Sequence, residues 1–124
     1  MKALTISVRT HITHERIADL LDSASRGSAY WAEGVDVLGY ESIVKGVIEC
    51  TAYNCDSHQV KIKDIESDEA VAIYVLNLAK IKRGLTVMAK KYPKHFADFL
   101  TENDDADTAD VFLQCALLGE VVYG

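Results

Sequence analysis

Two kinds of hydrophobic periodicity meet at Asn77, and this junction limits the folds open to the chain. Val71, Ile73 and Val75 recur at every second position, as in a β-strand. After Asn77, a residue type that caps helices, the apolar residues keep helical spacing. These apolar positions are Leu78, Ile81, Leu85, Met88, Ala89 and Tyr92. A strand therefore runs directly into a helix, which favours a mixed α and β fold.

Other segments alternate in the same way. Val60 and Ile62 are followed by the acidic run 66–69 and then by the strand that contains Val71, so we predict an antiparallel hairpin with an acidic turn. Residues 4–8 and 120–124 are each expected to form a short strand. Residues 34–58, interrupted by glycines, are interpreted as an irregular excursion with one short strand or helix.

Three further helices are expected from capping residues and breakers. Thr13 is a candidate N-cap for a helix that starts near residue 14 and bends or stops at Gly27. Pro93 ends the helix after Asn77 and begins a short one. Asp104 or Asp105 caps a last helix, which Gly119 ends. We predict one α+β domain over residues 1–124, with an antiparallel sheet packed against two or three helices.

Composition narrows the class of protein. The chain has 124 residues, of which 49% are hydrophobic and 26% charged, as in one ordinary globular domain. A net charge of -6 opposes non-specific binding to nucleic acid or anionic membranes. Three cysteines without a CxxC pair indicate free thiols, and no signal peptide or membrane span is recognised. We therefore expect a cytoplasmic protein.

The sign of the charge reverses between residues 80 and 110. Bases occupy 80–94 without an acid among them, and acids occupy 98–110 without a base. Four of the bases lie largely off the apolar face of the expected helix, and we interpret them as partner-binding candidates: Lys80, Arg83, Lys90 and Lys94. The alternative is an ordinary solvated helix face.

A second group of residues has the chemistry of a nucleotide site. Aromatic rings can stack on a base, arginine can bind phosphate, and Asn or Asp can recognise ribose or base edges. The candidate ligand-binding residues are Arg26, Tyr30, Trp31, Asn103, Asp104 and Asp105. In the alternative interpretation, Tyr30 and Trp31 end a helix and close the core.

Signals for catalysis and metals are weak. The pattern HxxHE at His11, His14 and Glu15 lacks the order of a zinc-protease motif and a fourth ligand, so surface histidines are favoured. Helix capping explains the acids at 104–110 without a cation. Cys115 falls on an apolar helix face and is interpreted as a core thiol. We predict no catalytic residues, no metal and no cofactor.

Three stretches together resemble a family of small phage and prophage accessory proteins, most of them without an assigned activity. The stretches are GSAYWA (27–32), LNLAKIKRGLTVMAKKYPKHFADF (76–99) and ENDDADTADVFLQCALLGEVVYG (102–124). The resemblance implies a phage product that acts in the bacterial cytoplasm. Such products include anti-CRISPR proteins and sponges for nucleotide immune signals.

Three functions follow as hypotheses. The first is a counter-defence binding protein that captures or blocks a bacterial immune protein or a cyclic-nucleotide-type signal. The second is a homo-oligomeric accessory protein with a structural or regulatory role, whose closing segment 120–124 pairs with a copy of itself. The third is a metal-dependent nucleotide hydrolase that uses the acids at 104–110.

Overall fold

Helices and strands alternate along the part of the chain that a computed structural model describes, residues 3–6, 9–33, 57–63 and 69–124. The elements are α1 (His14–Gly27), β1 (Ala32–Glu33), β2 (Ser57–Lys63), β3 (Ala70–Asn77), α3 (Leu78–Lys91), α4 (Pro93–Leu100) and α5 (Ala106–Leu118). They confirm the predicted α+β class. None of the helices in these residues has the length and apolar character needed to cross a bilayer.

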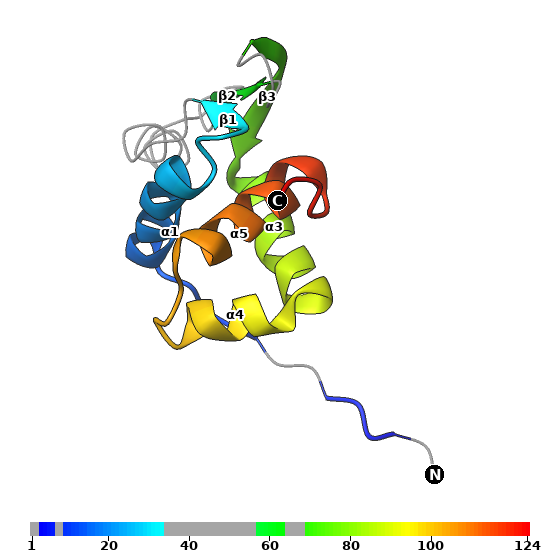
Figure 1. Cartoon of the computed structure of the whole chain (residues 1–124). Coiled ribbons are helices and arrows are strands. Elements are labelled where there is room, and N and C mark those ends of the chain that lie inside the picture. Colours follow the sequence, from blue (N-terminus) through cyan, green and yellow to red (C-terminus); the bar gives the residue numbers. More distant parts are fainter. Residues whose placement is uncertain (1–2, 7–8, 34–56, 64–68) are drawn as a thin grey trace, which may run out of the picture.

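Helix α5 is the central element. It packs against α1, α3 and α4, and Figure 1 shows it in orange between α1 and α3. Its buried residues extend round most of the helix rather than along one narrow stripe: Thr108, Ala109, Phe112, Leu113, Gln114, Cys115, Ala116 and Leu117. A helix with so wide a buried surface must be enclosed by several other elements. The sequence analysis placed Cys115 on an apolar face of this helix; Cys115 is buried, and burial extends well round the helix, leaving Asp107 exposed and Val111 and Leu118 half-buried on the remaining side.

Two glycines allow neighbouring helices to come very close to α5. A Cβ atom added to Gly84 of α3 would lie 2.7 Å from Cβ of Ala116 and 2.9 Å from its backbone nitrogen. A Cβ atom added to Gly27, at the end of α1, would lie within 3.2 Å of Cβ of Ala106 and still closer to its carbonyl group. The absence of a side chain at these positions therefore sets the spacing of α1 and α3 from α5.

The sheet is antiparallel, with strand order β1-β2-β3. Val60 pairs with Tyr74 and Ile62 pairs with Ala72, which confirms the predicted hairpin. Val60, Ile62 and Leu76 are buried. The row on the opposite face of β3 is exposed, with Val71, Ile73 and Val75 exposed by 64%, 57% and 38%. Residues 66–68 of the expected acidic turn lie outside the described part.

Capping residues define the helix ends as predicted. The side chains of Thr13, Asn77 and Asp105 accept hydrogen bonds from the backbone N–H groups three residues later. Pro93 is the first residue of α4, and Gly119 ends α5 in the left-handed conformation, with φ of 81°. Local chemistry therefore determines where each of these helices begins or ends.

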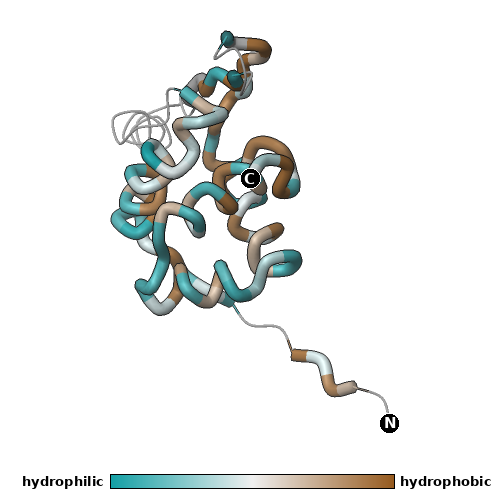
Figure 2. The backbone as a smooth tube through the Cα atoms, viewed as in Figure 1, coloured by the Kyte–Doolittle hydropathy of each residue, from teal (hydrophilic) through white to brown (hydrophobic). Residues whose placement is uncertain are grey.

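Neither expected terminal strand forms over the residues that the structure describes, and residues 7–8 of the first lie outside them. Residues 3–6 belong to no strand, and Leu4 and Ile6 are exposed by 92% and 75%. Figures 1 and 2 show this hydrophobic segment extending away from the helices. Residues 121–124 also form no strand, because side chains bind their backbone instead, as described below. Of the predicted excursion over 34–58, residues 34–56 lie outside the described part.

Replacing Gly84 by alanine tests the close contact between α3 and α5. Alanine has a higher helix propensity than glycine by about 1 kcal/mol, so propensity alone predicts a more stable protein. The contact with Ala116 predicts the opposite, because the backbones must separate, and we expect a loss of about 1–3 kcal/mol in the free energy of unfolding. Urea denaturation followed by circular dichroism measures it, with Thr86→Ala on the exposed face of α3 as the control. A Gly84→Ala variant as stable as the wild type would contradict the contact.

Candidate functional site

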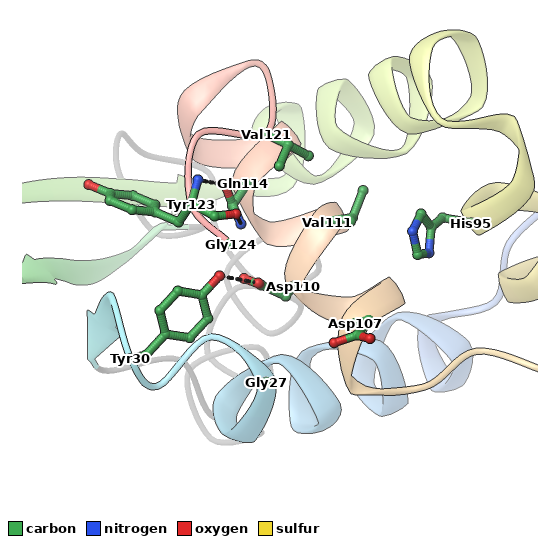
Figure 3. A pocket seen from close by; sticks show the side chains of 10 residues that line it. All are labelled: Gly27, Tyr30, His95, Asp107, Asp110, Val111, Gln114, Val121, Tyr123 and Gly124. Carbon is green, nitrogen blue, oxygen red and sulfur yellow. Dashed lines mark hydrogen bonds between the residues drawn. The ribbon is translucent and has the colours of Figure 1, made fainter. Parts of the chain in front are cut away.

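The carboxylate of Asp110 binds three side chains from the segment that follows α1. Its Oδ1 accepts hydrogen bonds from Ser28 Oγ at 2.9 Å and from Trp31 Nε1 at 2.7 Å. Its Oδ2 accepts one from the Tyr30 hydroxyl at 2.5 Å, shown as a dashed line in Figure 3. Bonds to an ionised acceptor are stronger than neutral ones, so Asp110 fixes this turn against α5.

Trp31 and Tyr30 have different environments. Trp31 is fully buried, and its ring stacks on that of Tyr123 with the centroids 5.3 Å apart. The core interpretation of Trp31 is therefore confirmed. Tyr30 is 39% exposed. Partial burial, and then the hydrogen bond to Asp110, raise the pKa of Tyr30 above its ordinary value, so the phenol stays protonated at neutral pH.

A second polar side chain of α5, that of the fully buried Gln114, holds the last residues of the chain. Gln114 Oε1 accepts from the N–H groups of Val122 at 2.7 Å and Tyr123 at 2.8 Å. Its Nε2 donates to the carbonyl of Tyr123 at 3.2 Å. The Tyr92 hydroxyl accepts from the N–H of Val121 at 3.0 Å. These bonds replace the strand pairing expected for this segment.

A pocket of about 450 Å³ lies between these two polar anchors. Figure 3 shows it bounded by the turn after α1, one side of α5, His95 of α4 and the C-terminal segment. Its lining residues are Gly27, Tyr30, His95, Asp107, Asp110, Val111, Gln114, Val121, Tyr123 and Gly124. Nδ1 of His95 lies 3.0 Å from Thr108 Oγ1, which fixes the imidazole ring.

The structure does not assemble the predicted nucleotide-binding group. Of its six residues only Tyr30 lines this pocket, and the buried ring of Trp31 has no face for a base to stack on. Arg26 pairs with Asp22 of the same helix at 3.3 Å. Asn103 donates to Thr101 Oγ1 at 3.2 Å. Asp105 is occupied as the N-cap of α5.

Asp104, the remaining member, binds Arg16. The guanidinium of Arg16 donates to Asp104 Oδ1 at 2.9 Å and to the carbonyl of Phe99 at 2.7 Å, and it lies over the Phe99 ring. Arg16 thereby ties α1 to the loop between α4 and α5. The sequence contains no signal for this pairing, because 88 residues separate the two partners.

The predicted partner-binding bases are not equivalent. Arg83 donates to the carbonyl of Ala116 in the last turn of α5, where a cation is favourable, so its charge also stabilises the fold. Lys80 is half-buried and lies 5.8 Å from the centre of the Tyr74 ring. Lys90 and Lys94 are exposed, as are Lys82 and Lys91. We call these four lysines the cationic surface; none forms a salt bridge to a described residue.

The other reactive side chains are unremarkable. Cys115 is fully buried, and burial raises the pKa of its thiol to about 11, so the reactive thiolate is disfavoured. His11, His14 and Glu15 are exposed at the start of α1. No three His, Cys, Asp or Glu side chains come together as metal ligands within the residues that the structure describes.

Comparison with protein-family models, with curated proteins and with solved structures found no match.

Replacing Asp110 tests its role as an anchor. Asp110→Ala removes the acceptor of the buried donors Ser28 Oγ and Trp31 Nε1, so we expect the free energy of unfolding to fall by about 2–4 kcal/mol. Asp107→Ala, an exposed acid one turn away, is the control and should change it by less than about 1 kcal/mol. Thermal or urea unfolding of both variants makes the comparison. Equal losses in the two would show that Asp110 contributes no more than a surface acid.

Proposed function

We propose that this protein is a non-enzymatic binding protein that captures or blocks a component of bacterial immunity in the bacterial cytoplasm. The observation that carries the proposal is the cationic surface, Lys82, Lys90, Lys91 and Lys94. The immune context comes from the resemblance of the sequence to phage and prophage accessory proteins.

Physical chemistry favours a protein partner for this surface. Four exposed lysines stand on α3 and the first turn of α4, with no acid between them in the sequence. Charges are screened over about 8 Å at physiological ionic strength, so a docked partner responds to the lysines that it touches rather than to the net charge. A long nucleic acid would also meet the acids of 98–110, in a chain of net charge -6. A compact acidic patch on a defence protein fits the surface better.

Capture of a nucleotide signal has less support. The base-stacking role needs an accessible ring at Trp31, which is buried, and the phosphate-binding role needs Arg26, which pairs with Asp22. The hydrolase is also disfavoured, because Asp104 and Asp105 are already used by Arg16 and by the N-terminus of α5.

Self-association is the second candidate function. It no longer rests on residues 121–124, whose N–H groups at Val121, Val122 and Tyr123 are bonded within the chain. The observation that favours it is the exposed row Val71, Ile73 and Val75 on β3, because exposed apolar rows of this kind are common at contacts between proteins. A homo-oligomer would bury this row.

Charge reversal tests the cationic surface. Lys90→Glu with Lys94→Glu changes two exposed residues that lack a salt bridge to any described residue, so the fold should remain intact. Arg83 and Lys80 are left unchanged, because each contacts another part of the fold. The control reverses the same number of charges elsewhere, Arg9→Glu with Lys61→Glu, both exposed.

The measurement is phage plating on bacteria that carry one defence system each and express the wild type, the double reversal or the control. We expect the wild type and the control to raise plating on a defended host, and the double reversal to lose that effect while keeping its melting temperature. Equal plating with all three proteins on that host would contradict the role of the cationic surface. Plating no better than with an empty vector on every host would contradict the immune function.

A further inference from the structure

We infer that the pocket between α1, α5 and the C-terminal segment binds a cationic group on an alkyl chain, an ammonium or a guanidinium. This inference does not depend on the cationic surface. It rests on the pocket, on its hydrogen-bonding groups and on its apolar wall.

The negative charge of the lining residues favours a cationic ligand. Asp107 and Asp110 lie three residues apart on α5, a spacing that places both side chains on one side of a helix. Figure 3 shows both at the pocket, and no Lys or Arg is among the ten lining residues. A phosphate or carboxylate ligand would meet two like charges there, whereas an ammonium or guanidinium would meet two opposite ones.

The lining groups offer hydrogen-bond acceptors, which favours a ligand that donates hydrogen bonds. Asp110 is held by three donors and has about one acceptor position left of the four that a carboxylate offers. The Tyr30 oxygen is already used, because its hydroxyl donates to Asp110 and also interacts with the side chain of Gln114. Asp107 forms no salt bridge to a described residue. A ligand rich in N–H groups fits these acceptors.

The volume of the pocket and its apolar wall favour a ligand that carries an alkyl chain next to its charged group. A volume of about 450 Å³ falls in the range of small-molecule sites and is far more than a bare ammonium needs. Val111 and Val121 supply an apolar wall beside the acids. Because Asp110 and Gln114 anchor the two sides of the pocket, the acceptors are in place before a ligand binds, which lowers the entropic cost of binding.

Such a cation has two sources, a free amine or an Arg or Lys side chain of a protein. Two probes separate them: agmatine, a free alkyl guanidine with a second amine, and N-acetyl-arginine amide, which mimics an arginine within a peptide. The single Trp31 is a built-in reporter, because its indole N–H is bonded to the Asp110 carboxylate that the cation would approach.

The experiment is an NMR titration of the Trp31 indole resonance at neutral pH and low salt. We expect at least one of the two probes to shift it with a dissociation constant of about 1 mM or below. The isosteric variant Asp107→Asn should weaken that binding about tenfold. The matched control Asp19→Asn, an exposed acid of α1 away from the pocket lining, should bind as the wild type does.

The outcomes are distinct. Tighter binding of agmatine identifies a free amine as the ligand class, and tighter binding of N-acetyl-arginine amide identifies a protein side chain. 1-Butanol and AMP, as neutral and anionic probes, should leave the resonance unchanged. No shift with either cation at about 10 mM, or equal binding to the Asp107→Asn and Asp19→Asn variants, would overturn the inference.

Discussion

The burial of α5 round most of its circumference is the constraint on which the rest of the described structure depends. Phe112, Leu113 and Gln114 are consecutive and all fully buried, so burial extends round most of this helix and several elements must enclose it. Gly84 and Gly27 let α3 and α1 approach until there is no room for a Cβ atom. The loop after α4 is tied to α1, and the three-stranded sheet stands beyond these helices (Figure 1).

Two polar side chains of α5, the half-buried Asp110 and the buried Gln114, fix the segments that border the pocket. Asp110 binds three donors from the turn after α1, and Gln114 binds the backbone of the C-terminal segment. Both would be costly inside the protein without partners. The hydrogen bonds that these two side chains form therefore place the turn after α1 and the C-terminal segment on opposite sides of the pocket. The cationic surface of α3 and α4 is separate from it, since no lysine lines the pocket.

Local signals predicted the local structure. Thr13, Asn77, Pro93 and Gly119 fixed the helix ends, because capping and backbone restrictions act within a few residues. Periodicity predicted the hairpin as well. It failed for residues 3–6 and 121–124, because alternation does not show whether a neighbouring strand exists. The contacts of Asp110 with Ser28 and of Arg16 with Asp104 join residues more than 80 apart, so no local pattern reveals them. The sequence identified the bases of α3, but it did not reveal that Arg83 stabilises the fold by donating to the carbonyl of Ala116.

Hydrogen exchange of the C-terminal amides tests most directly whether α5 organises the elements around it. Val122 is 59% exposed and lies in no strand, so its position alone predicts rapid exchange. Because Gln114 accepts from the N–H groups of Val122 and Tyr123, we predict that both amides exchange far more slowly than those of Leu4 and Ile6 in the exposed N-terminal segment. Protection should disappear in Gln114→Ala. Amides of Val122 and Tyr123 that exchange in the wild type as fast as those of Leu4 and Ile6 would contradict the account.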